Sequence, residues 1–260
     1  MTDKVELKFE GKIATVVLNR PESLNAMDGE LWLGLEKAAS AIVARRRVRV
    51  AILTGAGDRA FSAGLDLKAA ASGQVLAASR CRRPGYDAVT AIKGIYTMYE
   101  NLPIPVIAAI NGYCFGGAVQ LILCCDIRLA ADHAVMGFPE VDLGALPDLG
   151  GTQRLPRMVG LGYAKELIYT ARRIDATEAL RIGLVDHVYP RERLMAEAWK
   201  LAEEIAAKDP MVVQAAKRAV NATMSQDLAS GLGLETTLAV QLLGDGKRLA
   251  QLAAELQKKR

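Results

Sequence analysis

The sequence predicts an α/β fold followed by a helical segment at the carboxyl-terminal end. In the first half, short apolar or alternating stretches that are typical of strands recur between longer amphipathic stretches that are typical of helices. After about residue 190 the strand pattern stops and only helical periodicity remains. Because these helices have apolar faces but no sheet of their own to cover, we expect two parts: a core over residues 1–190 and a helical assembly element over residues 191–260.

The predicted elements follow one another in a regular order. The strands Val5–Phe9 and Ala14–Leu18 flank Glu10-Gly11-Lys12, which is a hairpin signal. Asp28 is expected to cap a helix that runs to about Arg45. The remaining predicted elements are a strand at Val48–Leu53, a helix from about Tyr86 to Asn101, a strand at Val106–Ile110, and tail helices at Arg191–Ala207, Pro210–Thr223, Leu228–Leu243 and Lys247–Lys259.

Composition narrows the class of protein. About half of the 260 residues are apolar and a quarter are charged, which is ordinary for a globular protein. No amino-terminal targeting pattern is visible, and the apolar runs are shorter than the roughly 20 residues that span a bilayer. The cysteines Cys81, Cys114, Cys124 and Cys125 lack the spacing of metal ligands. We therefore expect a cytoplasmic protein with reduced thiols, no membrane partner and no metal site.

We do not expect this chain to bind nucleic acid. A formal net charge of +4 is too small to indicate nucleic-acid binding, although it suits an anionic ligand. The run Arg45-Arg46-Arg47-x-Arg49 could contact phosphates, but it lies at a predicted helix end where the helix dipole favours positive charge. We interpret the run as a solvated helix terminus.

Two turns centred on glycine stand out. The first is Phe61-Ser62-Ala63-Gly64-Leu65-Asp66, and the second is Asn111-Gly112-Tyr113-Cys114-Phe115-Gly116-Gly117, which links the strand Val106–Ile110 to an apolar helix. A helix that begins at Gly116-Gly117 leaves its first N–H groups without intrahelical acceptors. Such donors suit a developing negative charge, for example an enolate or thioester oxyanion. Tight packing alone would also explain either turn.

The order of several motifs resembles the crotonase superfamily, also called the enoyl-CoA hydratase/isomerase family. Residues 103–159 resemble its signature region, and the Asn19–Ala26, Phe61–Asp66 and Arg173–Val185 segments match in the same order. The resemblance covers roughly residues 5–190. It implies a spiral of strand–strand–helix units, a carboxyl-terminal helical element that forms trimers or dimers of trimers, and a coenzyme A thioester as substrate.

The resemblance also assigns binding residues. It implies that the thioester oxygen lies between the backbone N–H groups of Leu65 and Gly117, which form an oxyanion hole. It places the adenine of coenzyme A near the backbone at Ala63, and it includes Leu65 among the substrate-binding residues through its backbone alone. Lys68 could meet a phosphate.

The acid and base positions separate the possible reactions. Hydratases of this family use two glutamates on one water; the second matches Glu140, but the first position is occupied by Gln120. A glutamine forms hydrogen bonds but cannot take up a proton at neutral pH. The stretch Glu140–Gly150 resembles dienoyl-CoA isomerases, in which the residues matching Glu140 and Asp148 move protons between carbons. An alternative role for Asp148 is to cap a helix beginning near Leu149.

These positions predict an enzyme that acts on an acyl-CoA through an oxyanion-stabilised enolate. We favour double-bond isomerisation of an enoyl- or dienoyl-CoA, with Glu140 and Asp148 as the proton-transfer pair. The alternatives are hydration by Glu140, with Gln120 orienting the water, and an acyl-CoA binding protein without catalysis. This chemistry requires no cofactor beyond the coenzyme A of the substrate.

Overall fold

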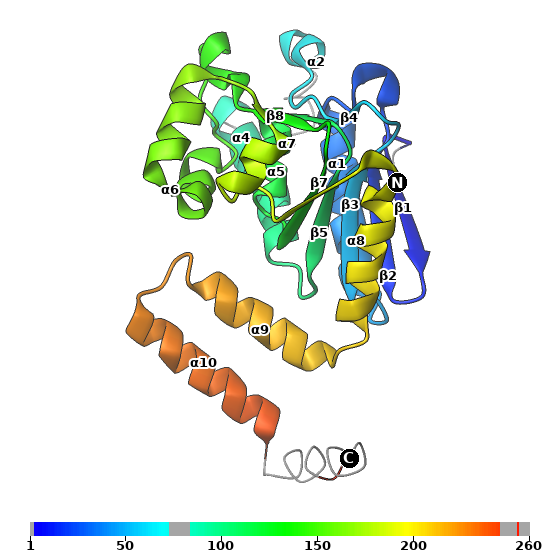
Figure 1. The fold of residues 1–260 in the computed structure, drawn as a ribbon, viewed down its shortest axis with the longest axis vertical. Coiled ribbons are helices and arrows are strands. Elements are labelled where there is room, and N and C mark those ends of the chain that lie inside the picture. Colours follow the sequence, from blue (N-terminus) through cyan, green and yellow to red (C-terminus); the bar gives the residue numbers. More distant parts are fainter. Residues whose placement is uncertain (1–2, 73–83, 245–253, 255–260) are drawn as a thin grey trace. The chain divides into compact units, whose positions relative to one another are not determined.

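The computed structural model describes residues 3–72, 84–244 and 254. Within these residues the predicted α/β architecture is confirmed (Figure 1). The chain divides into two compact units, Met1–Ala206 and Ala207–Arg260. The predicted helix at Lys247–Lys259 lies outside the described residues, apart from residue 254. In the described part of the chain, no helix combines the length and hydropathy needed to cross a membrane.

A six-stranded sheet forms the centre of the first unit. Its strands, in spatial order, are β1 (Val5–Glu10), β2 (Ile13–Leu18), β3 (Val50–Gly55), β5 (Val106–Ile110), β7 (Ile127–Ala131) and β10 (His187–Tyr189). The hairpin of β1 and β2 is antiparallel, and every other neighbouring pair is parallel. The four strands predicted for the first half of the chain are β1, β2, β3 and β5, and each forms within two residues of its expected bounds. Both β3 and β5 are buried along their whole length, as expected for central parallel strands.

The short strands that alternate in the sequence with those of the larger sheet form a second, smaller sheet. It consists of β4 (Ala60–Ser62), β6 (Tyr113–Phe115), β8 (Val135–Gly137) and β9 (Ile174–Asp175), in that order. Because β4 follows β3, β6 follows β5 and β8 follows β7, each pair of consecutive strands contributes one strand to each sheet. A helix follows each pair, so the expected strand–strand–helix units are confirmed.

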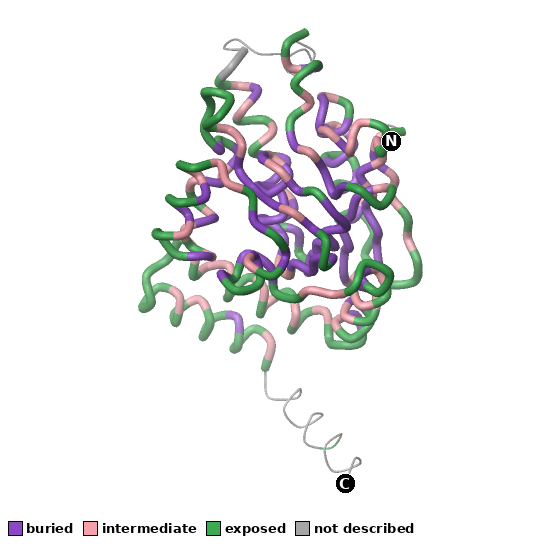
Figure 2. The backbone as a smooth tube through the Cα atoms, turned by 45° about the horizontal axis from the view of Figure 1, so that its top comes forward, coloured by how far each residue is buried: buried purple, intermediate pink, exposed green. Residues whose placement is uncertain are grey.

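Helices cover both faces of the larger sheet. The helices of this unit are α1 (Gly29–Ala44), α2 (Leu67–Ala71), α4 (Pro84–Glu100), α5 (Gly117–Ile122), α6 (Gly151–Thr170), α7 (Ala176–Arg181) and α8 (Arg191–Ala206), with 3-10 turns η1 (Pro21–Ser23) and η2 (Pro139–Leu143). Asp28 caps α1 as predicted, because its side chain accepts a hydrogen bond from the Leu31 N–H at 2.9 Å. Figure 2 shows that the strands between these helices are largely buried.

The helix α8 belongs to the first unit. The tail was expected to separate from the core after residue 190, but the compact unit extends to Ala206. Leu194, Ala198, Ala202 and Ala206 form a stripe along α8 and pack with alternate residues of the central strands, such as Ile52. Residues of the opposite parity on the same strands face α1, α4 and α5. The small side chains of the stripe allow α8 to lie directly on the sheet.

The second unit contains α9 (Pro210–Ala222) and α10 (Leu228–Leu243), which contact each other. Asp209 and Asp227 cap the two helices through hydrogen bonds to backbone N–H groups. Many apolar side chains on these helices are exposed: Met211, Val212, Val220, Leu228, Leu232, Val240 and Leu243.

Candidate active site

The two glycine-centred turns meet in the folded chain. A Cβ atom added to Gly64 would lie 2.4 Å from the Phe115 carbonyl oxygen and 3.3 Å from the Gly117 nitrogen. Gly64 also has a φ of +85°, which side chains rarely allow. Only glycine therefore permits the first turn to approach the second this closely, and this contact brings the predicted donor positions Leu65 and Gly117 onto neighbouring segments.

Both predicted donors have free backbone N–H groups. The Met27 N–H donates to the Gly64 oxygen at 2.7 Å, and the Asp66 N–H donates to the Met27 oxygen at 3.0 Å. This parallel bridge leaves the Leu65 N–H on the opposite edge of the segment. Gly117 is the first residue of α5, so its N–H has no intrahelical acceptor. Among the described residues, neither N–H donates to a protein acceptor, and two such donors can stabilise an oxyanion.

Asn25 supports the first turn, a role that could not be predicted from the sequence. It is completely buried and has a φ of +55°. Its side chain accepts from the Arg20 N–H at 2.8 Å and donates to the oxygens of Ala56 at 3.0 Å and Ala60 at 2.8 Å. These bonds tie the chain before α1 to the strand β4, which leads directly into the turn. The segment was recognised as a motif, but hydrogen bonds within a turn carry no periodic signal.

Arg20 holds the other end of the same turn. Its guanidinium donates to the Asp66 carboxylate at 2.9 Å and to the Ala26 oxygen at 2.6 Å. Asp66 also caps α2 by accepting hydrogen bonds from the N–H groups of Lys68 and Ala69. These backbone hydrogen bonds and the Arg20 guanidinium lower the pKa of Asp66. The carboxylate therefore remains ionised and anchors the segment that contains Leu65.

The predicted coenzyme A contacts lie on this turn and the helix after it. Ala63 is partly buried, and its N–H donates to the Leu24 oxygen at 2.9 Å. Lys68 lies in the first turn of α2 with an exposed side chain. The structure thus groups Ala63, Leu65 and Lys68 within one short segment beside the second turn.

Gln120 and Glu140 are in direct contact. The Gln120 Nε2 donates to the Glu140 Oε1 at 2.8 Å. The Gln120 Oε1 accepts from the Leu149 N–H at 2.7 Å and from the Gly151 N–H at 2.9 Å. Gln120 is only 2% exposed, so its carboxamide links the start of α6 to the Glu140 carboxylate. The two lone pairs of its oxygen are both used, and it has no remaining acceptor site for a water.

The other oxygen of Glu140 is placed differently. Its Oε2 is buried and, within the described residues, has no hydrogen-bond partner. Burial is the largest influence on this carboxyl and raises its pKa, the hydrogen bond from Gln120 lowers it, and the nearby negative charge of Asp148 raises it further. A carboxylate with a raised pKa and one free oxygen can both remove and return a proton.

Asp148 does not cap a helix, so the capping alternative is wrong. The helix α6 begins at Gly151, its N-cap is Gly150 in the left-handed region, and no side chain caps it. The Asp148 side chain is instead exposed, while its neighbours Pro147 and Leu149 are buried. Its carboxylate is close enough to Glu140 to influence that group electrostatically.

Tyr96 is a buried neighbour of the site that the sequence did not reveal. Its hydroxyl donates to the Met27 Sδ at 3.1 Å. A Cβ atom added to Gly117 would lie 3.3 Å from the same hydroxyl. Complete burial raises the pKa of Tyr96, so it remains neutral. Tyr96 therefore contacts Met27, which pairs with the segment that contains Leu65, and lies close to Gly117. From the sequence it is only one apolar position of an amphipathic helix.

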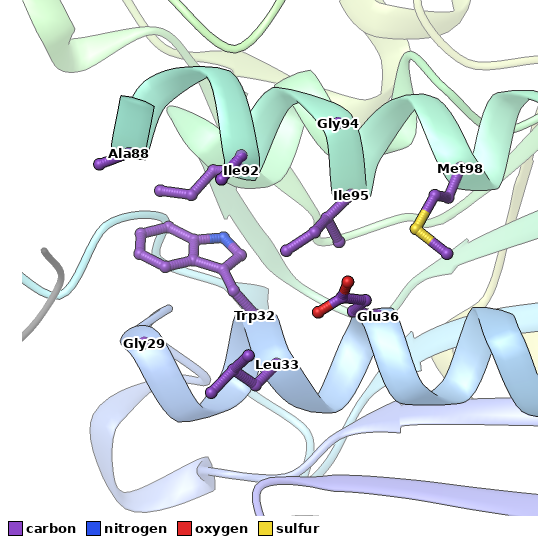
Figure 3. Close-up of a pocket in the computed structure, with 10 residues that line it drawn as sticks. Gly29, Trp32, Leu33, Glu36, Ala88, Ile92, Gly94, Ile95 and Met98 are labelled. Carbon is purple, nitrogen blue, oxygen red and sulfur yellow. The ribbon is translucent and has the colours of Figure 1, made fainter. Parts of the chain in front are cut away.

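A separate pocket of about 490 Å³ lies between α1 and α4 (Figure 3). Trp32 and Leu33 line it from α1, and the Glu36 carboxylate lies near its other end. From α4 it is lined by Ala88, Ala91, Ile92, Gly94, Ile95 and Met98. None of the predicted site residues is among its lining residues.

Comparisons with known proteins identify the family of the chain. The family model for enoyl-CoA hydratase/isomerase matches residues 8–250. The chain is 42% identical over 251 residues to a Bacillus subtilis protein named putative enoyl-CoA hydratase/isomerase YngF, with 95% of this chain and 93% of that protein covered. It is 40% identical over 233 residues to the crotonyl-CoA hydratase of Syntrophomonas wolfei, with 90% and 87% covered.

A solved structure extends the comparison to the fold. The crystal structure of an enoyl-CoA hydratase from Bacillus anthracis superposes with a TM-score of 0.89 and 39% sequence identity, covering 98% of this chain and 97% of that one. The match spans the sheets, the two glycine-centred turns and the helical tail. The chain is therefore an enzyme of the enoyl-CoA hydratase/isomerase family and has the crotonase fold.

Proposed function

We propose that the enzyme moves a carbon–carbon double bond within the acyl group of a coenzyme A thioester. The observation that carries the proposal is that the three polar side chains predicted for catalysis differ in their hydrogen bonding and exposure. The Gln120 oxygen already accepts two hydrogen bonds and its amide group donates to Glu140, whereas the Glu140 Oε2 is buried and has no partner among the described residues. Asp148 is the carboxylate whose charge acts on Glu140. The available groups are thus two carboxylates that can move protons.

The reaction begins with the thioester oxygen between the Leu65 and Gly117 N–H groups. Glu140 removes a proton from the carbon next to the carbonyl of a 3-enoyl group, and the C–H electron pair forms a dienolate. The two donors stabilise the negative oxygen, an effect on the order of 3–4 kcal/mol for one such donor. A proton then adds two carbons further along, and the double bond ends adjacent to the carbonyl.

Asp148 is the proposed donor of that second proton. In the simplest cycle, Asp148 accepts the proton that Glu140 removed and delivers it to the carbon two positions further along. Both carboxyl groups then end the cycle in the states in which they began, and the exposed Asp148 side chain can exchange the transferred proton with solvent. The coenzyme A moiety is held by the turn that contains Ala63 and Leu65, with Lys68 near a phosphate. No other cofactor enters the cycle.

Hydration is the second candidate, and the names of the relatives favour it. The Syntrophomonas wolfei relative is a crotonyl-CoA hydratase, and a 39% identical protein of Clostridium acetobutylicum is a short-chain-enoyl-CoA hydratase. In this alternative, the Glu140 Oε2 takes a proton from water as the water oxygen attacks the third carbon of the acyl chain, and it then gives that proton to the carbon next to the carbonyl. Gln120 could contribute only its second Nε2–H, because its oxygen already accepts two hydrogen bonds.

A comparison of substrates and variants separates the two candidates. We expect wild type to convert a 3-enoyl-CoA faster than it hydrates a 2-enoyl-CoA, and Asp148→Asn to slow the first reaction. Rapid hydration by wild type, together with unchanged isomerisation by Asp148→Asn, would contradict the proposal. Binding of every substrate without turnover would instead indicate an acyl-CoA binding protein.

We also propose that the chain assembles as a trimer or a dimer of trimers. The support is the set of exposed apolar side chains on α9 and α10, which have no sheet to cover in the described part of their own unit.

A further inference from the structure

We propose that Gln120 is a positioning residue that holds Glu140 by one carboxylate oxygen and so assigns proton transfer to the other, Oε2. This inference rests on the proposed function, because it takes Glu140 to be the base. It differs from the water-orienting role considered for Gln120, since the residue acts here on the carboxylate and not on the substrate or water.

The orientation of the Gln120 carboxamide is fixed by the backbone of α6. Two N–H groups, those of Leu149 and Gly151, donate to one end of the amide at 2.7 and 2.9 Å. Only the oxygen can accept these bonds, because an amide NH₂ group offers donors alone. A flipped amide would bring donors against donors in a buried site. The Nε2 group is therefore forced to face Glu140.

This orientation makes the two oxygens of Glu140 unequal. Oε1 accepts the hydrogen bond from Gln120 at 2.8 Å, whereas Oε2 is buried and has no partner among the described residues. The hydrogen bond withdraws electron density from Oε1 and restricts rotation of the carboxylate. Oε2 keeps its lone pairs free and is the oxygen that can receive a proton from a substrate.

Two glycines make the arrangement possible. A Cβ atom on Gly116 would lie 3.2 Å from the Glu140 Oε1. A Cβ atom on Gly151 would lie 3.0 Å from both Cγ and Oε1 of Gln120, and 2.7 Å from the Pro147 Cβ. A methyl group at position 151 must therefore displace the Pro147 side chain and also press against Gln120, which has to give way as well.

A glutamate at position 120 would disturb this arrangement in a predictable way. Its second oxygen would lie near the Glu140 Oε1 at hydrogen-bonding distance, and two carboxylates so close must share a proton. Among the described residues, the ionisable groups coupled to Glu140 are the exposed carboxyl group of Asp148 and the buried hydroxyl of Tyr96. Neither supplies a positive charge that would offset the repulsion.

The test measures the pH dependence of turnover for wild type, Gln120→Glu and Gly151→Ala. For Gln120→Glu we expect the acidic limb of kcat/KM to move to higher pH by about one unit or more. For Gly151→Ala we expect kcat to fall about tenfold or more with little change in KM, because the displaced amide misplaces the base. Gly162→Ala is the matched control, since it lies on the same helix with open space around the added methyl group, and its activity should stay near wild type.

Two outcomes would overturn the inference. One is a Gln120→Glu variant whose acidic limb coincides with that of wild type. The other is a folded Gly151→Ala variant as active as Gly162→Ala. The variant Glu140→Gln distinguishes this failure from failure of the proposed function: if it retains turnover, Glu140 is not the base. If Glu140→Gln is inactive while the Gln120 and Gly151 variants behave as wild type, only the positioning role is wrong.

Discussion

Replacing Glu140 by glutamine should remove activity and stabilise the folded protein. In wild type, the Glu140 Oε2 is buried without a partner among the described residues, and burial raises the pKa of this carboxyl. Glutamine places a neutral NH₂ group where Oε2 lies, and this group also lacks a partner among the described residues, so the substitution removes only the cost of burying the charge. Each unit of pKa shift corresponds to about 1.4 kcal/mol, and this cost is moderate because Gln120 still stabilises the other oxygen and the side chain is not fully enclosed. We therefore expect a gain of about 1 kcal/mol near neutral pH.

The gain should depend on pH with a definite sign. Because the folded-state pKa is raised above its ordinary value of 4.5, the folded protein binds a proton more readily than the unfolded chain. The stability that this group contributes is fully present below pH 4.5 and is lost as pH rises through the folded-state pKa. Glu140→Gln has no such loss. The difference in free energy of unfolding between variant and wild type should grow with pH above 4.5 and then level off.

Urea denaturation at a series of pH values measures this difference, and turnover of a 3-enoyl-CoA is measured on the same samples. Asp142→Asn is the matched control, because Asp142 lies on the same turn η2 with an exposed side chain. A Glu140→Gln variant that is less stable than wild type, or whose stability difference does not vary with pH, would refute the reasoning. Retained turnover would refute the catalytic role.

Three further predictions follow from the site and the tail. Gly117→Pro removes one oxyanion donor and should lower kcat by about 100-fold or more. Circular dichroism should still show a folded protein, because proline is tolerated in a first helical turn. The control Gly117→Ala keeps the N–H and should retain more activity. Denaturant titrations of Asn25→Ala should show a free energy of unfolding about 2–4 kcal/mol lower than that of wild type, because the hydrogen bonds of Asn25 are lost and alanine disfavours the left-handed backbone. Asn25→Gly also loses the hydrogen bonds but tolerates the left-handed backbone, so its loss of stability should be smaller. Light scattering at micromolar concentration should give the mass of a trimer or hexamer, and a stable monomer would contradict the assembly proposal.

The sheet and its first helix could be predicted because their signals are local. The strand Val106–Ile110 is a short apolar run bounded by prolines and a glycine turn, and it forms over those residues. Asp28 caps its helix because its side chain reaches an N–H three residues ahead. The glycine-centred turns could also be recognised, because a close approach of two backbone segments requires glycine, and glycine can be read from the sequence.

The contacts around Glu140 could not be predicted because they are tertiary. Gln120 could be recognised as an unusual residue at its position, but not as a bridge between the start of α6 and Glu140. Asp148 was open to a capping role because it precedes a helix. Gly150 takes the N-cap position, and the helix begins one residue later. The packing of α8 on the sheet was missed for a similar reason, since its small-residue stripe also suits a tail helix.

Product analysis by mass spectrometry in heavy water tests the central claim most directly, namely that Glu140 shuttles protons to move a double bond. Wild-type enzyme is incubated with a 3-enoyl-CoA and, separately, with a 2-enoyl-CoA, and Glu140→Gln serves as the control. Our account predicts a 2-enoyl product from the first substrate, with deuterium exchanged into the acyl chain but no oxygen added, and no reaction with Glu140→Gln. Conversion of the 2-enoyl-CoA to a hydroxyacyl-CoA, with no migration of the double bond in the 3-enoyl-CoA, would contradict it.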